Sequence, residues 1–135
     1  PMGSVLCGSR ELIKEARKYR KMLGGGMRQA GIVAAAGLYA LDNNIERLAE
    51  DHANAQLLAT ELAQIDGIEL VTVNTNMLFI KVAHGYAELR EALFSQGIIF
   101  PKTANKAGLI RLATHLDVSH SDILRVVTEI KQFMR

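Results

Sequence analysis

Hydrophobic residues recur at helical spacing early in the chain. Between Ser9 and Leu23 the apolar side chains share one face of a predicted helix, and basic side chains share the opposite face (Arg10, Lys14, Arg17 and Lys21). Ser9 is a suitable N-cap, and the glycines at 24–26 are expected to end the helix. Ahead of it, the apolar residues within 3–8 predict a short buried strand between glycines.

The next predicted helix, over residues 28–43, is apolar around nearly its whole circumference. Such a helix has to be buried, and its apolar run at 30–41 is too short to span a membrane. Asn44 is the expected N-cap of a long amphipathic helix that runs to about Ile65. His52 falls near the apolar face of that helix, which favours a hydrogen-bonded core histidine.

From residue 68 onward the hydrophobic spacing becomes that of strands. Strands are predicted at 68–73, 77–82, 98–101 and 109–114, a helix at 86–96, and a final helix capped by Ser119 or Ser121. This order predicts a small α+β layer structure with helices on one face of a sheet. The first part, in contrast, holds a single strand, which cannot make a sheet. We therefore divide the chain into residues 1–44 and 45–135.

Composition places limits on the function. The 135 residues carry a net charge of +2, which is too balanced to indicate a nucleic-acid binder. The positive charge is local, because residues 1–28 hold seven basic and two acidic groups. A single cysteine excludes an internal disulfide framework and favours a reducing compartment. The chain enters an apolar segment without a leader, from which we expect a fragment of a longer protein.

The glycine loop is the first candidate site. Three glycines ahead of a helix can present backbone N–H groups to an anion, and Lys21 and Arg28 flank them with positive charge. These features are typical of a phosphate or carboxylate site. The alternative is a flexible loop between two helices, and the segment lacks the Gly-Lys-Ser/Thr of a nucleotide P-loop.

Arg111 is the second candidate, because it alternates with apolar residues in a predicted strand. A guanidinium in such a strand needs a partner, and its planar fork fits a carboxylate. The alternative partner is an acid of the last helix, Glu129 or Asp122, in a structural ion pair.

Other polar residues give weaker signals. His115, Asp117 and His120 match no regular zinc spacing, so no metal site is predicted. Cys7 lies among apolar residues and is expected to be an inert buried thiol. The basic face of the first helix lacks interleaved aromatic residues, which favours a solvated surface over nucleic-acid binding.

Three segments resemble the low-specificity L-threonine aldolases. They are Gly3-Ser4-Val5-Leu6-Cys7-Gly8-Ser9, the run from Arg20 to Gly31 that contains Leu23-Gly24-Gly25-Gly26-Met27-Arg28, and Arg111-Leu112-Ala113-Thr114-His115-Leu116-Asp117. The resemblance covers the whole chain but only the C-terminal part of a family member. It implies an α/β enzyme of the aspartate-aminotransferase fold (type I). Residues 1–44 would then end the large cofactor domain, and residues 45–135 would form the small α+β domain.

The resemblance also implies a reaction and its groups. Family members use pyridoxal phosphate to cleave L-threonine or L-allo-threonine to glycine and acetaldehyde. Arg111 would bind the substrate carboxylate, and Lys21 and Arg28 would approach the cofactor phosphate. The Schiff-base lysine would lie upstream of Pro1, so this chain alone is expected to be inactive. A cytoplasmic homo-oligomer, dimer or tetramer, is expected, without nucleic acid or membrane; the alternative is a stand-alone anion-binding or protein-interaction module.

Overall fold

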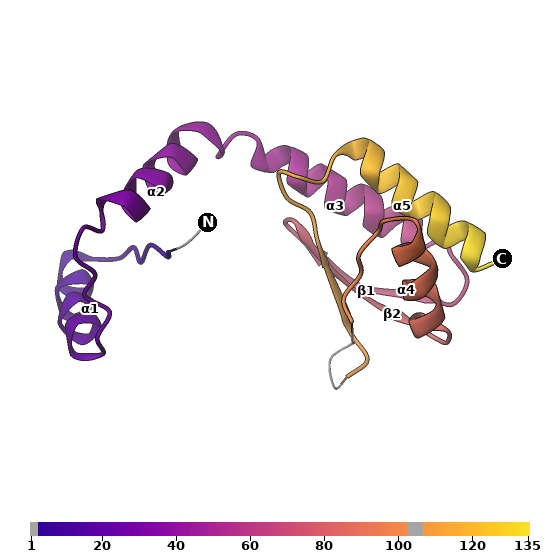
Figure 1. The fold of residues 1–135 in the computed structure, drawn as a ribbon, viewed down its shortest axis with the longest axis horizontal. Helices are drawn as coiled ribbons and strands as arrows, with labels where there is room; N and C mark the ends of the chain where they lie inside the picture. Colours follow the sequence, from indigo (N-terminus) through magenta and orange to yellow (C-terminus); the bar gives the residue numbers. More distant parts are fainter. Residues whose placement is uncertain (1–2, 103–106) are drawn as a thin grey trace. The chain divides into compact units, whose positions relative to one another are not determined.

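The computed structural model describes residues 3–102 and 107–135. The chain forms two compact units, Pro1–Glu46 and Arg47–Arg135. In the described residues the first unit contains two helices, α1 and α2, and the second combines helices with a three-stranded sheet (Figure 1). This mixture of helices and strands confirms the predicted α/β class.

Helix α1 (Arg10–Met22) has the predicted bounds and caps. The Ser9 hydroxyl accepts the backbone N–H of Leu12 at 3.2 Å and so satisfies one free donor of the first turn. After the helix, Gly24 adopts φ +78°, a left-handed conformation that glycine reaches without a steric penalty. The local sequence is therefore sufficient to define both ends of α1.

The predicted strand at residues 3–8 does not form. These residues are irregular and pair with no strand of the described chain, and Val5 is 79% exposed. A strand needs a neighbouring strand for its backbone N–H and C=O groups. The described part of the first unit contains no other strand, so the prediction of a buried strand was wrong for this chain.

Helix α2 (Gly31–Asn43) begins three residues later than predicted. Residues 28–30 form a turn in which Gln29 adopts φ +52°, and this left-handed residue interrupts the helical backbone. Asn44 is the C-cap of α2, not the N-cap of the next helix as predicted. Within the unit α2 buries no side chain, and Ile32 is 80% exposed.

The second unit opens with α3 (Leu48–Leu62). Its buried face includes Ala55, Leu58 and Leu62 together with two polar residues, Asp51 and Asn54. His52 lies outside that face and is exposed, so the predicted core histidine was wrong.

Strands β1 (Ile68–Asn74) and β2 (Met77–Val82) form the predicted antiparallel hairpin, with a bulge between Leu70 and Thr72. Strand β3 (Ile110–Ala113) pairs antiparallel with the other side of β2, which places Arg111 opposite Phe79. The sheet order is thus β1-β2-β3, and β3 lies at one edge.

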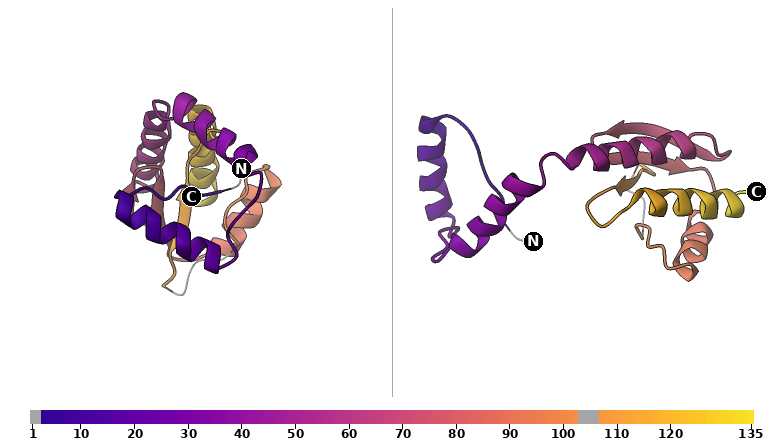
Figure 2. Two further views of the ribbon diagram at one scale, coloured as in Figure 1. Left: turned by 90° about the vertical axis from the view of Figure 1, so that its left-hand side faces the viewer. Right: turned by 90° about the horizontal axis from the view of Figure 1, so that it is seen from above.

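Three helices complete the layer structure of the second unit. Helix α3 packs on β1 and β2, α5 (His120–Phe133) packs beside α3, and α4 (Tyr86–Ser95) packs against α5 (Figures 1 and 2). Ser119 caps α5 in a reciprocal capping box with Asp122. The buried core is drawn from all these elements and includes Leu58, Leu62, Leu78, Ile80, Leu89, Leu93, Ile110, Leu112, Ile123, Val127 and Ile130.

The predicted strand at 98–101 is also absent. These residues are irregular, and Pro101 has no N–H to offer to a ladder. The segment is anchored instead by Phe100, which joins the core, and by the Tyr86 hydroxyl, which donates to the Pro101 carbonyl at 2.7 Å. Most of the loop predicted at 102–108 lies outside the described residues.

Candidate functional site

The glycine loop of the first unit brings a lysine close to its backbone. A Cβ added at Gly26 would lie 3.3 Å from Lys21 Cδ and 3.7 Å from Lys21 Nζ. The Lys21 side chain therefore folds back over the loop and lies close to the backbone at Gly26. The loop itself is closed by a hydrogen bond of 2.8 Å from the Gly25 N–H to the Arg20 carbonyl.

Arg28 stands in the turn that precedes α2 rather than in its first helical turn as predicted. The start of α2 has no side-chain cap, and its N-cap residue is Ala30. Within the described residues, Lys21 and Arg28 are exposed and make no ion pair. The first unit thus has free backbone N–H groups at the start of α2 and two cations without an ion-pair partner in the described residues. These are the groups that an anion-binding site needs.

Arg111 lies in the second unit, at the middle of edge strand β3. Ile110 and Leu112 point into the core, whereas Arg111 is exposed because side chains alternate along a strand. Among the described residues its side chain pairs with neither Glu129 nor Asp122, the acids named above as alternative partners. Its five guanidinium donors are therefore available to a ligand.

A cavity of about 460 Å³ opens beside Arg111. One wall is the irregular segment 97–101, a second is β3 with residues 114–118, and a third is the start of α5. Its charged residues are Arg111, Asp117, Asp122 and Arg125, and Thr114 is a further polar residue of the lining. The apolar residues around them include Leu58, Ile98, Ile99, Phe100, Val118, Ile123 and Val126. A small molecule with one carboxylate and a short aliphatic part suits such a lining.

Internal contacts already occupy two of the other charged groups in this cavity. The Ser119 hydroxyl and backbone N–H donate to Asp122 Oδ2 at 2.6 and 2.9 Å, and these bonds hold the pKa of the Asp122 carboxyl below its usual range. The Arg125 guanidinium donates to the Gln96 carbonyl. Arg111 is therefore the cavity's uncommitted cation among the described residues.

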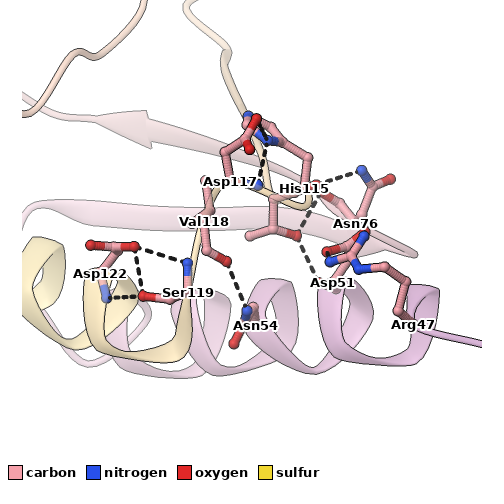
Figure 3. A network of polar contacts seen from close by, with 10 residues as sticks. Arg47, Asp51, Asn54, Asn76, His115, Asp117, Val118, Ser119 and Asp122 are labelled. Atoms are coloured by element: carbon pink, nitrogen blue, oxygen red, sulfur yellow. Dashed lines mark hydrogen bonds and ion pairs between the residues drawn. The ribbon is translucent and has the colours of Figure 1, made fainter. Parts of the chain in front are cut away.

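A buried polar network was missed by the sequence analysis (Figure 3). Asp51, Asn54 and Thr114 are each at most 3% exposed, and all are hydrogen-bonded. Asp51 and Asn54 share the helical phase of Leu58 and Leu62, so two polar residues on an apolar helix face were the available signal.

The remaining candidates carry no site. The Asp117 N–H donates to His115 Nδ1 at 3.3 Å, and no cluster of three metal-ligating side chains occurs in the described residues. Cys7 is exposed, because residues 3–8 form no buried strand, so the prediction of a buried thiol was wrong. The helices of the described chain include none with the length and hydropathy needed to cross a membrane.

Comparison with known proteins places these features in a family. Residues 1–84 match the family model of the beta-eliminating lyases. The chain is 44% identical over 135 residues to the low specificity L-threonine aldolase of Escherichia coli K12, covering 99% of this chain and 39% of that protein. It is 38% identical over 140 residues to low-specificity L-threonine aldolase 1 of Arabidopsis thaliana, covering 99% of this chain and 38% of that protein.

The fold has a counterpart among solved structures. A chain of L-threonine-O-3-phosphate decarboxylase from Porphyromonas gingivalis superposes with a TM-score of 0.50 at 17% identity, covering 60% of this chain and 26% of that chain. This likeness concerns the fold alone. Against its curated relatives, the chain spans about two fifths of their length.

Proposed function

Because the chain belongs to the beta-eliminating lyase family, we propose that it forms the C-terminal part of a low-specificity L-threonine aldolase. The observation that carries this proposal is the 44% identity, which extends over essentially the whole chain, to an aldolase of that name. The matched length includes both the glycine loop and Arg111.

The proposed reaction is a retro-aldol cleavage of L-threonine or L-allo-threonine. The β-hydroxyl loses its proton, the Cα–Cβ bond breaks, and the products are acetaldehyde and, after protonation at Cα, glycine. Pyridoxal phosphate, when bound, supplies the electron sink for such a cleavage. The contribution of this chain is to bind and orient ionic groups.

Arg111 is proposed to bind the substrate carboxylate. It is exposed to the cavity, and no acid among the described residues competes for its guanidinium. A planar fork can meet both carboxylate oxygens at once, which fixes the orientation of the substrate as well as its position.

Lys21 and Arg28 are proposed to approach the cofactor phosphate. The glycine loop fits an anion because Lys21 lies over Gly26 and both cations lack an ion-pair partner in the described residues. Neither residue is proposed to be the Schiff-base lysine. That lysine is expected upstream of Pro1, so the 135-residue chain alone is proposed to be inactive.

Association with a second copy is part of the proposal. Helix α2 buries no side chain within its own unit although Ile32, Leu38 and Leu41 are large and apolar. We expect the chain to form a dimer or higher oligomer through this helix. Sedimentation velocity checks this, and a clean monomer at high concentration contradicts it. A cytoplasmic location is proposed from the single cysteine.

The activity is tested on the longer protein that contains this chain, loaded with pyridoxal phosphate. Incubation with L-threonine is expected to release glycine and acetaldehyde in equal amounts, measured by amino-acid analysis and by coupled reduction of the aldehyde. The 135-residue chain assayed in parallel is expected to release neither. Absence of both products from the loaded longer protein would disprove the proposed activity.

A second candidate is a stand-alone anion-binding or interaction module. The exposed basic face of α1 favours it, since none of its cations is paired among the described residues. In that case the 135-residue chain would bind inorganic phosphate or an acidic peptide with a dissociation constant that does not change when the rest of the protein is present. Calorimetry on both proteins distinguishes the two functions.

A further inference from the structure

The end of strand β3 is held by several hydrogen bonds that are buried or partly buried. Residues 114–118 continue from β3 and form part of the wall of the Arg111 cavity. Figure 3 shows that side chains from α3 and from the turn between β1 and β2 converge on this segment. The segment is thus fixed by groups that lie outside the cavity itself.

Thr114 is the centre of this arrangement. Its hydroxyl donates to the Asp51 carbonyl of α3 at 2.6 Å, and its N–H donates to the Asn76 carbonyl at 2.9 Å. The Asn76 side-chain amide in turn donates to the Thr114 carbonyl at 2.7 Å. The peptide groups on both sides of Thr114 are therefore fixed to the hairpin turn, and its side chain is fixed to the helix layer.

Two further contacts fix the supports of Thr114. The Arg47 guanidinium meets the Asp51 carboxylate at 2.8 and 3.2 Å, which immobilises the first turn of α3. The Asn54 amide donates to the Val118 carbonyl at 3.1 Å, which holds the far end of the segment. No buried side-chain nitrogen or oxygen of the described residues lacks a partner, and a fully satisfied network of this kind is rigid.

The backbone of Arg111 is held by core packing and, at the end of β3, by this network. Its strand neighbours Ile110 and Leu112 are both buried in the core. Strand β3 is four residues long and, among the described strands, pairs with β2 alone, and Arg111 is three residues before Thr114. Its side chain has no partner of its own among the described residues, so the strand backbone sets where the guanidinium stands. A two-point contact with a carboxylate tolerates errors of only about 0.5 Å in that position.

We propose that Thr114, supported by Asn76, is a positioning residue of the carboxylate site: its contacts to α3 and to the hairpin turn fix the backbone that carries Arg111. This inference rests on the proposed function, in which Arg111 binds the carboxylate. Thr114 lies in the cavity wall, but its hydroxyl and the peptide groups on both sides of it are already bonded to α3 and to the hairpin turn. Its loss should therefore act through Arg111 and weaken recognition of the carboxylate.

The test compares Thr114→Val with Thr114→Ser in the longer cofactor-loaded protein. Valine has nearly the shape of threonine but no hydroxyl, whereas serine keeps the hydroxyl. Calorimetry measures the dissociation constants of glycine and of methylamine, which has the amine but no carboxylate. We expect Thr114→Val to weaken glycine binding roughly tenfold and to leave methylamine binding within about twofold, and Thr114→Ser to restore glycine binding.

Two variants complete the design. Thr128→Val removes an exposed threonine hydroxyl that donates to the Leu124 carbonyl at 2.8 Å, and it is expected to change neither constant. Asn76→Ala removes the amide that holds the Thr114 carbonyl from a partly exposed turn, and it is expected to reproduce the glycine-specific loss. It decides the question if Thr114→Val does not fold.

If Thr114→Val weakens the binding of glycine and methylamine equally, Thr114 serves the stability of the fold and the proposal is overturned. Unchanged glycine binding would also overturn it. A wild-type protein without any preference for glycine over methylamine also overturns it, because no carboxylate site would exist to be positioned. The proposed function can fail independently of this role. If the variant loses glycine binding specifically but the wild-type protein does not cleave L-threonine, the positioning role stands and the aldolase function is disproved.

Discussion

Each unit contains a helix with a serine N-cap, but the two helices differ in how much of their apolar face is buried. Helices α1 and α5 have 13 and 14 residues, and each is preceded by an N-cap serine whose hydroxyl accepts a hydrogen bond from the first turn. Helix α5 then buries Ile123, Val127 and Ile130, whereas α1 buries nothing. Local sequence defines where a helix starts, but stability comes from an apolar face that meets another element.

This difference predicts that the same leucine-to-alanine substitution costs much more stability in the second unit than in the first. Leu62 in α3 is completely buried and Leu38 in α2 is 62% exposed. Leu62→Ala leaves a cavity and is expected to lower the free energy of unfolding by about 2–5 kcal/mol. Leu38→Ala is expected to change it by less than about 0.5 kcal/mol. Urea unfolding followed by circular dichroism at low protein concentration measures both, and similar losses would show that the first unit has a packed core of its own.

The two units also differ in their proposed binding roles: the second unit carries the residue for the substrate carboxylate, and the first carries those for the cofactor phosphate. In the longer protein, Arg111→Ala and Arg111→Lys are expected to lower kcat/KM for L-threonine roughly a hundredfold or more, because lysine keeps the charge but loses the fork. Cofactor content and Tm should stay near wild type. Activity near wild type would show that Arg111 does not bind the substrate carboxylate.

The matched change in the first unit is Arg28→Ala. We expect it to weaken retention of pyridoxal phosphate roughly tenfold, since it removes one charge-assisted contact to the phosphate. Cofactor absorbance after dialysis gives the measurement. If the variant keeps its cofactor and its KM for L-threonine rises, Arg28 binds the substrate rather than the cofactor phosphate, which contradicts the proposal.

The two serine caps offer a smaller contrast. Ser119→Ala removes the capping box of a helix that packs on the core, so the free energy of unfolding should fall by about 1 kcal/mol. Ser9→Ala should reduce helix content at α1 without changing the main unfolding transition. Thermal melts of the two variants, followed by circular dichroism, compare them, and an equal shift of Tm would mean that the units unfold together.

The smallest effect expected depends on pH and concerns Asp122. Hydrogen bonds from Ser119 lower the pKa of its carboxyl in the folded chain. The resulting stabilisation is present above the ordinary carboxyl pKa and is lost as the pH falls through the lowered folded value. Unfolding of wild type and Asp122→Asn should therefore differ at neutral pH and converge in acid. A difference that persists in strong acid would contradict this origin.

The sequence predicted well where structure depends on neighbours along the chain. The Ser9 cap, the hairpin around Asn74 and the capping of α5 follow from residues a few positions apart. It failed where a distant partner decides. The segment at 3–8 has no neighbouring strand in the described chain, and the one at 98–101 is held by Tyr86 and the core rather than by pairing with a strand.

The candidate site shows the same limit. Arg111 was identified because a charge between apolar strand residues is conspicuous. Thr114 was not, because a threonine at the end of a strand is ordinary until its bond to the Asp51 carbonyl is known. That contact joins residues 63 positions apart, which no local pattern encodes.

The position of β3 at the edge of the sheet also bears on aggregation. In the described part of the chain no strand covers its outer side, and such an edge is a template on which strands of other molecules can add. The strand is short, and it carries a charge at its second residue, Arg111. Both features discourage edge-to-edge growth, so the guanidinium proposed to recognise a substrate also acts as a gatekeeper against fibril-like assembly.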